Sequence, residues 1–247
     1  MKKLLLFIIL CTLVGVGTIY AFVPQYGISS GLVGYWTFDT RNIVWTSATA
    51  ATTIDISGNN NGGTLTNMSK ATSPAIGKMG QALSFDGVND YVDAGNQASL
   101  QITGAMTIAF WLNGDGKDAF TEGMVSKLGA SRGYQVGFFN NGSGFFRIAS
   151  NISTLVTLTL GSHTANIWEH WVCIYIPSTS MTCFKNGNQV YQTTTSIPAS
   201  QYSASNNLRI GTRADETGTM IGKLDDIRIY NRALSASEVK QLYRMGK

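Results

Sequence analysis

Charged side chains are scarce in this chain of 247 residues. Lysine, arginine, aspartate and glutamate together make up 13% of the sequence, against roughly 25% in an average soluble protein. The two histidines belong to no cluster of candidate metal ligands. The formal net charge is +4, and once Lys2 and Lys3 are set aside no basic cluster remains to contact phosphate groups. The sequence therefore indicates neither a nucleic-acid partner nor a histidine-based metal site.

Cysteine is also rare, and two of its three copies lie close together in the sequence. Cys173 and Cys183 flank a predicted hairpin whose turn is residues 177–180. Whether their sulfur atoms meet depends on the register that this turn sets. A disulfide and two buried thiols both remain open, and a disulfide would persist only after export to an oxidising compartment.

The N-terminus carries a long apolar run. Lys2 and Lys3 precede residues 4–16, which are almost wholly apolar, in the layout of a secretion signal. The apolar run from Leu4 to Val23, of about twenty residues, is also long enough to span a bilayer. The sequence thus predicts a secreted or cell-surface protein, with residues 1–22 as a cleaved signal peptide or a retained membrane anchor and residues 23–30 as a linker.

After this segment, apolar side chains alternate with others in short stretches bounded by turn residues. Residues 106–112 are the clearest case, because Met106, Ile108 and Phe110 share one face of an extended chain. The chain has about twelve such stretches in all, at spacings of about eight to twelve residues. Residues 41–53 are expected to be an inserted loop. This spacing, with one predicted helix, indicates an all-β fold of two packed antiparallel sheets rather than alternating strands and helices.

The chain closes with a predicted strand over residues 222–230 and a short helix that begins with a Ser-x-x-Glu capping box at Ser235. In a regular strand Asp225 shares a face with Ile227 and Ile229. A carboxylate beside an apolar layer must be paired, hydrogen-bonded or bound to a metal, because desolvating it alone costs several kcal/mol. This strand is therefore the first place to look for a site.

Two motifs together resemble a known family. Residues 224–239 (Leu-Asp-Asp-Ile-Arg-Ile-Tyr-Asn-Arg-Ala-Leu-Ser-x-x-Glu-Val) and residues 85–92 (Phe-Asp-Gly-Val-Asn-Asp-Tyr-Val) are similar to signatures of LamG-like jelly-roll domains, in the concanavalin A-like lectin and glucanase group. Residues 34–39 resemble the family's opening Gly-x-Trp-x-Phe-Asp. The resemblance implies that residues 31–247 form one two-sheet antiparallel jelly-roll sandwich with a short C-terminal helix.

The resemblance also implies a structural Ca²⁺. Residues 55–63 are similar to the family's Asp-x-Ser-Gly-Asn-x-Asn-x-Gly loop, and the family places its first and last strands side by side. The implied ligands are Asp39, the loop around Asn60 and Gly62, and Asp225, because Ca²⁺ takes six to eight oxygen atoms from carboxylates, amides, backbone carbonyls and water. The alternative is that these acids cap turns or accept hydrogen bonds from backbone amides.

Catalysis is the alternative that this group of folds raises. Retaining glycosidases need two carboxylates about 5 Å apart, and the glucanase relatives carry Glu-x-Asp-x-x-Glu, which is absent here. The chain has four glutamates, Glu122, Glu169, Glu216 and Glu238. Asp225 and Asp226 are adjacent, so in a regular strand they point to opposite faces. We therefore expect no enzyme, with glycoside hydrolysis as a less favoured function.

The function that remains is recognition. Sugar sites combine aromatic faces with a few polar groups, and the candidate aromatic residues beside polar loops are Trp45, Phe120, Tyr134 and Tyr202. Each is also a candidate loop anchor. We expect a non-catalytic, secreted or surface-tethered domain that binds a glycan, a glycoconjugate or another surface protein. The alternative is a structural surface protein that self-assembles without binding free sugar, and membrane contact is expected only through an uncleaved N-terminal segment.

Overall fold

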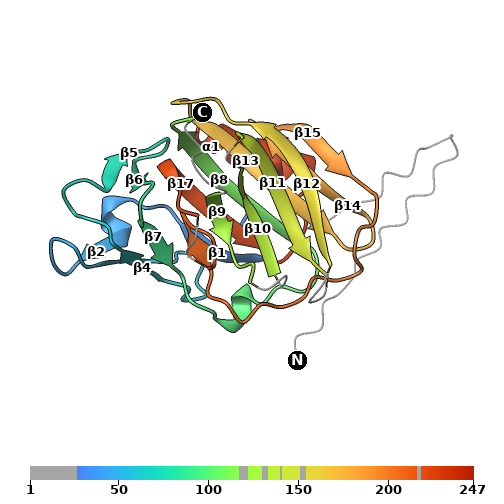
Figure 1. The fold of residues 1–247 in the computed structure, drawn as a ribbon, viewed down its shortest axis with the longest axis horizontal. Coiled ribbons are helices and arrows are strands. Elements are labelled where there is room, and N and C mark those ends of the chain that lie inside the picture. The colour runs from blue at the N-terminus through green and yellow to red at the C-terminus, as the bar shows by residue number, and fades with distance from the viewer. Residues whose placement is uncertain (1–26, 117–121, 130–132, 140, 151–153, 216–217) are drawn as a thin grey trace, which may run out of the picture.

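The computed structural model describes residues 27–116, 122–129, 133–139, 141–150, 154–215 and 218–247. Within these ranges the chain forms two antiparallel β-sheets packed face to face, with helix α1 (Ala236–Met245) outside one of them (Figure 1). The predicted two-sheet sandwich with a C-terminal helix is confirmed. The predicted signal peptide or anchor lies outside the described residues. No helix in the described ranges has both the length and the apolar character that a membrane crossing requires.

The first sheet has eight strands in the order β15-β14-β13-β8-β17-β6-β5, with β1 also paired to β17. Its strands are β1 (Leu32–Trp36), β5 (Pro74–Ile76), β6 (Gln81–Asp86), β8 (Met106–Gly114), β13 (Glu169–Ile176), β14 (Ser180–Lys185), β15 (Asn188–Thr193) and β17 (Ile221–Tyr230). The second sheet has nine strands in the order β12-β11-β10-β9-β16-β7-β4-β3-β2. Its strands are β2 (Ile43–Trp45), β3 (Ala51–Thr53), β4 (Gly63–Thr66), β7 (Tyr91–Asp93), β9 (Glu122–Ser126), β10 (Gly133–Phe138), β11 (Ser143–Ala149), β12 (Leu155–Ser162) and β16 (Arg209–Ile210).

The described residues contain more strands than the alternation predicted. Seventeen are present, because very short strands offer too few alternating residues to be recognised. The inserted loop expected over residues 41–53 is an example. It contains the short 3-10 helix η1 (Thr40–Asn42) and the hairpin β2–β3, in which Ile43 lies opposite Thr53. A second 3-10 helix, η2 (Ala98–Leu100), precedes β8.

The first and last strands lie side by side, as the family resemblance implied. Trp36 of β1 lies opposite Ile227 of β17, while β6 pairs with the first half of β17, where Leu83 lies opposite Leu224. The strands β1 and β6 therefore flank successive halves of the same central strand. The segment that leaves β1 and the segment that enters β6 meet at the middle of β17.

A β-bulge interrupts β17 at this point. Asp226 has a left-handed backbone conformation with φ of 51°, and the pairing with β8 shifts register next to it. A bulge inserts one residue, so the alternation of faces reverses beyond it. Leu224 therefore lies in the core with Ile227, and Asp225 lies opposite Trp111 on the outer face of the sheet. The prediction that Asp225 shares a face with the isoleucines is wrong.

The main core lies between the two sheets. Its largest buried side chains include Trp36, Phe110, Phe138 and Trp171. Burying one large apolar side chain contributes about 1.5–3 kcal/mol, so this layer accounts for most of the packing between the sheets. The core thus explains why so many aromatic residues appear in a chain with few charges.

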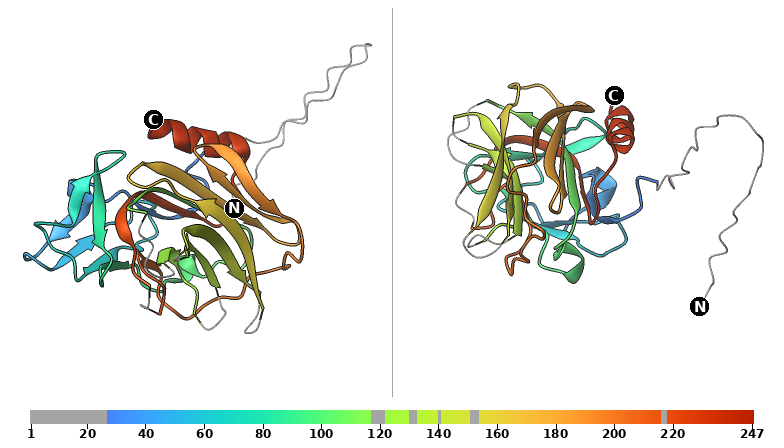
Figure 2. Two further views of the ribbon diagram at one scale, coloured as in Figure 1. Left: turned by 45° about the horizontal axis from the view of Figure 1, so that its top comes forward. Right: turned by 90° about the vertical axis from the view of Figure 1, so that its right-hand side faces the viewer.

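A second, smaller cluster lies on the outer face of the first sheet, beneath α1. Val239 and Leu242 of the helix pack with Val172, Phe184 and Tyr230 of the strands. Figure 2 shows the helix lying across this surface. The predicted capping box is present, because the Ser235 hydroxyl accepts from the Glu238 amide at the start of α1.

Cys173 and Cys183 lie directly opposite each other on β13 and β14. Their sulfur atoms are joined in a disulfide, and both residues are fully buried. Of the two alternatives that the sequence left open, the structure has the disulfide.

Candidate functional site

Two acidic side chains reach the same loop, residues 77–81. The Gln81 amide donates to Asp39 Oδ1 at 3.1 Å, and the Met79 amide donates to Asp225 Oδ2 at 2.8 Å. Asp39 follows β1 and the loop enters β6, so both arrive at the middle of β17, where Asp225 lies. The structure therefore brings together the first and last of the predicted metal ligands.

Gly77 and Gly80 allow this close approach. A Cβ atom added at Gly77 would lie 2.6 Å from Asp225 Oδ2, and one added at Gly80 would collide with Asp39 Oδ1. Gly80 also has a left-handed backbone conformation, with φ of +69°, which favours glycine. The sequence analysis did not assign a role to this loop, although the two glycines three residues apart are a signal of close backbone approach.

Asp225 is completely buried, and its Oδ1 atom has no hydrogen-bond partner among the described residues. Burial raises the pKa of this carboxyl group to about 7, and hydrogen bonds from Met79 and other backbone amides act in the opposite direction. A buried carboxylate that lacks a partner is stabilised by a proton or by a cation. The unpartnered oxygen of Asp225 therefore fits either a proton or a cation.

A hollow of about 730 Å³ opens beside Asp39. Its lining residues are Asp39, Thr40, Arg41, Met79, Gly80 and Gln81. Thr40 Oγ1 donates to Gln81 Oε1 at 2.8 Å, and Gln81 Nε2 donates to the Phe38 carbonyl at 3.0 Å. Arg41 Nη2 lies 3.9 Å from Asp39 Oδ2. The hollow thus offers a carboxylate and an exposed guanidinium group. It also offers a hydroxyl and an amide that hydrogen bonds hold in place.

Asn60 and Gly62 line a different hollow, of about 400 Å³. Its lining residues are Thr52, Thr53, Ile54, Asp55, Asn60, Gly62, Gly63 and Thr64. Asp55 organises this loop, because it accepts from the amides of Ser57 and Asn61. The structure therefore places this predicted pair around a turn capped by Asp55, and neither residue lines the hollow beside Asp39.

The described residues contain no group of three or more His, Cys, Asp and Glu side chains that could hold a metal ion. A Ca²⁺ site does not require three carboxylates, since backbone carbonyls and water complete its coordination. Asp39 and Asp225 meet at one loop, and the unpartnered oxygen of Asp225 fits a bound cation. Of the predicted ligands, Asp39 and Asp225 contact this loop, whereas Asn60 and Gly62 line the other hollow.

The predicted aromatic ligand contacts do not form one surface. Trp45, on β2, is half-buried and packs against the main core. Tyr202 is 43% exposed, and its amide donates to the Ala149 carbonyl of β11. The strands β2 and β11 lie toward opposite ends of the second sheet, so these two rings cannot stack on the same sugar. Phe120 lies outside the described residues.

Tyr134 is a core residue. Its side chain is 1% exposed and belongs to the cluster between the sheets, and its hydroxyl donates to the Leu100 carbonyl at 3.4 Å. The prediction that Tyr134 contacts a ligand is wrong, because the pleat of β10 directs the ring inward.

Asp225 and Asp226 do not form an accessible catalytic pair. Asp226 is 2% exposed and pairs with Arg228 at 3.1 Å on the outer side of β17. Because of the bulge, Asp225 and Asp226 both lie on the outer face, while Leu224 and Ile227 lie in the core. The expectation that the two acids point to opposite faces is therefore wrong. Both carboxylates are nevertheless buried, and a substrate cannot reach them.

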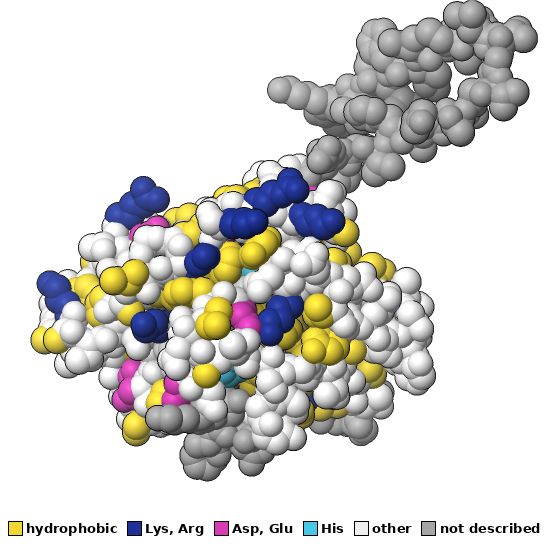
Figure 3. All heavy atoms as spheres, turned by 90° about the horizontal axis from the view of Figure 1, so that it is seen from above, with side chains coloured by type: hydrophobic (Ala, Val, Ile, Leu, Met, Phe, Trp, Pro, Cys, Tyr) yellow, Lys and Arg dark blue, Asp and Glu magenta, His cyan; other side chains and the backbone are white. Residues whose placement is uncertain are grey.

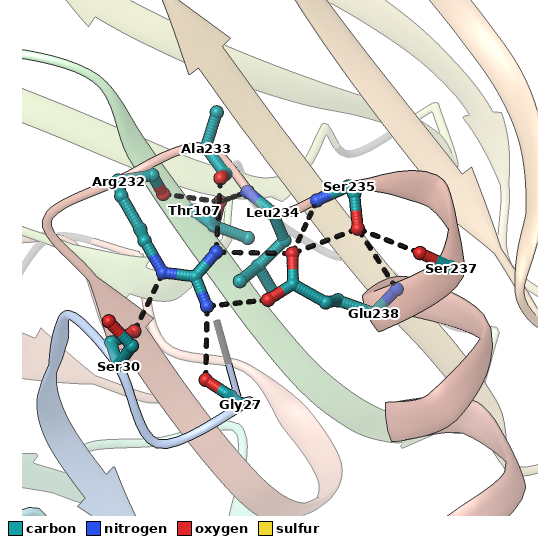
Figure 4. A network of polar contacts seen from close by, with 9 residues as sticks. All are labelled: Gly27, Ser30, Thr107, Arg232, Ala233, Leu234, Ser235, Ser237 and Glu238. Atoms are coloured by element: carbon teal, nitrogen blue, oxygen red, sulfur yellow. Dashed lines mark hydrogen bonds and ion pairs between the residues drawn. The ribbon is translucent and has the colours of Figure 1, made fainter. Parts of the chain in front are cut away.

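The glutamates whose side chains the structure describes have structural partners. Glu169 pairs with Lys185 at 2.8 Å, and Glu238 pairs with Arg232 at 2.6 Å. Burial alone would raise the pKa of Glu238, but Arg232 and Ser235 hold it below its ordinary value. Figure 4 shows the network around this pair. Arg232 also donates to the Ser30 carbonyl, so the helix is tied to the segment that enters β1.

Comparison with known proteins agrees with this architecture. Residues 86–240 match the model of the concanavalin A-like lectin/glucanases superfamily. No curated protein matches the sequence. Among solved structures, the binding domain of Paraclostridial Mosquitocidal Protein 1 is similar with a TM-score of 0.67 and 17% identity, over 88% of this chain and 52% of that one.

Two other solved structures are similar at comparable levels. The binding domain of Botulinum neurotoxin DC, in complex with rat synaptotagmin II, has a TM-score of 0.63 and 12% identity over 90% of this chain and 53% of that one. Domain 4 of AbnA, an extracellular arabinanase from Geobacillus stearothermophilus, in complex with arabinotriose, has a TM-score of 0.63 and 19% identity over 86% of this chain and 98% of that one. The chain thus spans about half the length of the toxin binding domains and nearly all of the arabinanase domain. At these identities the likeness shows a shared fold.

The family match covers more than half of the sequence, and the chain belongs to the concanavalin A-like lectin/glucanases superfamily.

Proposed function

We propose that this chain is a non-catalytic recognition domain that binds a glycan in the hollow beside Asp39. The single observation that carries the proposal is the set of polar side chains that line this hollow, in which Thr40 donates to Gln81 and Gln81 donates to the Phe38 carbonyl. Sugars present many hydroxyl groups, so they need both donors and acceptors in fixed positions. Asp39 supplies acceptors, Arg41 supplies donors and Met79 supplies an apolar surface.

The arabinanase domain supports the ligand class. Its structure contains arabinotriose, and this chain covers nearly all of it. The toxin binding domain in complex with rat synaptotagmin II supports recognition of a surface protein as the second kind of partner. The glycan is the better fit here, because four of the six residues that line the small hollow have polar side chains.

The proposal includes a structural Ca²⁺ held by Asp39 and Asp225. When bound, the ion supplies positive charge to the buried oxygen of Asp225 and links β17 to the loop that forms one wall of the hollow. These two acids are the residues that would hold it. The ion has no catalytic role in this proposal.

We also propose that the protein acts outside the cell, as a secreted or surface-tethered domain. The support is the signal-like N-terminal segment, together with the buried disulfide between Cys173 and Cys183, since disulfides persist mainly in oxidising compartments.

A glycan array with Ca²⁺ present, followed by calorimetry on the best oligosaccharide, tests the proposal. The variant Thr40→Ala/Arg41→Ala removes a hydroxyl and a guanidinium group from the hollow, and Thr64→Ala is the matched control in the other hollow. We expect the double variant to weaken binding by about tenfold or more, which corresponds to about 1.4 kcal/mol, and the control to bind like the wild type.

Two outcomes would contradict the proposal. One is a folded wild-type protein that binds no glycan on the array, and the other is a glycan whose affinity depends on Thr64 rather than on Thr40 and Arg41. Concentration-dependent assembly without glycan binding, measured by sedimentation, would favour the structural surface protein instead.

A further inference from the structure

A third hollow, of about 180 Å³, lies between the C-terminal part of α1 and the turn that joins β14 to β15. Its lining residues are Asn186, Gly187, Asn188, Lys240, Tyr243, Arg244 and Lys247. Three of these are basic and none is acidic. The helix places Lys240 and Arg244 on one face, because residues four positions apart are neighbours, and Lys247 follows just after the end of α1.

The three basic side chains have no partner of opposite charge. Lys240, Arg244 and Lys247 are exposed, and none forms an ion pair with a carboxylate among the described residues. A concave site lined by one sign of charge concentrates ions of the other sign. The helix dipole favours cations only within the last turn, and Lys240 is the fifth residue of α1, so the dipole does not account for the whole cluster.

The fold holds the walls of this hollow in place. The Tyr243 ring stacks on Trp111 with centroids 5.7 Å apart. Gly187 has φ of +78°, and a Cβ added there would lie 3.1 Å from the Tyr243 ring, so glycine allows the turn to approach the helix. Asn186 Oδ1 accepts from the His170 amide at 2.9 Å, while the Asn186 amide donates to the His170 carbonyl at 2.8 Å. The Tyr243 ring on the helix and the Asn186 side chain in the turn are therefore held in place.

A neighbouring hollow extends the site along the helix. Arg244 also lines a space of about 420 Å³ together with Ser237, Gln241 and Met245. Figure 3 looks onto the face that carries α1, where basic side chains stand out among uncharged ones. A ligand that places an anionic group at Lys240 and Lys247 can thus continue past Arg244 toward uncharged hydrogen-bonding groups.

We infer that this pair of hollows binds an acidic glycan, with a carboxylate or sulfate group between Lys240, Arg244 and Lys247. The asparagine and glutamine side chains suit sugar hydroxyl groups, and the concave shape suits a chain of sugar units more than a flat lipid surface. This site is separate from the hollow beside Asp39, because the two share no lining residue.

The test uses the full exported chain and three polysaccharide probes. Dextran sulfate carries sulfate groups, polygalacturonate carries carboxylates, and neutral dextran carries neither. Calorimetry compares the wild type with Lys240→Ala/Arg244→Ala and with Lys70→Ala/Lys223→Ala, a control pair that removes the same charge elsewhere. We expect one or both acidic probes to bind, about tenfold more weakly to the helix variant than to the control, and less tightly as salt rises from about 50 to about 300 mM. Neutral dextran should not bind at this site.

The acidic probes also separate the source of the anion, since either one binding alone assigns carboxylate or sulfate. An equal loss of affinity in both variants would overturn the inference, because the attraction would then follow net charge alone. So would a folded protein that binds neither probe, or one that prefers phosphatidylserine vesicles to both. The Thr40→Ala/Arg41→Ala variant should retain the acidic probe, so this site can fail without affecting the first proposal.

Discussion

Asp39 and Asp225 accept hydrogen bonds from the amides of Gln81 and Met79, two residues apart on one loop. Asp39 follows the first strand and Asp225 lies on the last, so this loop connects the two ends of the domain. Because Gly77 and Gly80 leave no room for a side chain there, the arrangement depends on both the acids and the glycines. The helix α1 packs on the same outer face of the sheet, where Trp111, opposite Asp225, stacks on Tyr243.

Asp225 should make stability depend on pH. The native state keeps the proton up to about pH 7, whereas the ordinary pKa is 3.8. The native state therefore binds more protons than the unfolded chain between these values, and the free energy of unfolding falls as pH rises through this window. In the absence of divalent cations, Asp225→Asn should remove a dependence of about 2–4 kcal/mol. Urea unfolding at about pH 4 and about pH 8 measures it.

The comparison must be made against the wild type at each pH, because burial also raises the pKa of Asp90, to about 6. That contribution has the same sign and is present in both proteins, so it cancels. A difference between the two proteins that does not change with pH would contradict the account of Asp225.

Calcium should stabilise the protein in a way that depends on both acids. A ligand at about 100 times its dissociation constant stabilises by about 2.7 kcal/mol, and protons compete with the cation for Asp225. The melting temperature should therefore rise on replacing EDTA with Ca²⁺ at about pH 8, and less so at about pH 5. Asp39→Asn and Asp225→Asn should abolish the response, while Asp86→Asn, at an exposed turn, should keep it. A response that survives both substitutions would place the ion elsewhere.

Gly80→Ala should damage the hollow more than an equivalent substitution at another left-handed glycine. Gly58 has φ of +90° with no atom within 4 Å of an added Cβ, whereas a Cβ at Gly80 collides with Asp39 Oδ1. Gly58→Ala should cost about 1 kcal/mol, from backbone conformation alone. Gly80→Ala should cost about 2 kcal/mol or more and should weaken glycan binding. Equal costs, with binding unchanged, would show that Asp39 does not need its present position.

Arg232→Ala should destabilise the domain by about 2–3 kcal/mol, because it removes charge-assisted hydrogen bonds to Glu238 and leaves that buried acid without its cationic partner. Arg244→Ala is the control, because Arg244 lies on α1 with Glu238 but is exposed. This substitution should change the free energy of unfolding by less than about 0.5 kcal/mol. Denaturant unfolding measures both. Similar small effects would mean that the network in Figure 4 contributes little to holding α1.

The sequence predicted well the features that depend on neighbouring residues. Alternation over residues 106–112 predicted β8, and the Ser-x-x-Glu motif predicted the start of α1. The family motifs, rather than periodicity, placed the first and last strands side by side. The strand and the helix start can be predicted without knowledge of distant contacts. The pairing of the first and last strands cannot, and the family resemblance supplied it.

The wrong predictions concern residues whose placement depends on contacts with distant parts of the chain. The bulge at Asp226 reverses the faces of β17, and its sequence carries no glycine to mark the left-handed residue. Tyr134 stands beside polar residues in sequence, yet its strand buries it. The sequence analysis recognised no basic cluster, because Lys240 and Arg244 become neighbours only through helical spacing and Lys247 joins them beyond the end of the helix.

The most direct test of the central claim is a titration of nitrogen-15-labelled protein, in Ca²⁺, with the glycan that binds best on the array. The account predicts that the amide signals of Gly80 and Gln81 move most and that Thr40→Ala/Arg41→Ala suppresses the shifts. If those signals stay in place while amides elsewhere in the described sheets respond, the sugar does not bind in the hollow beside Asp39.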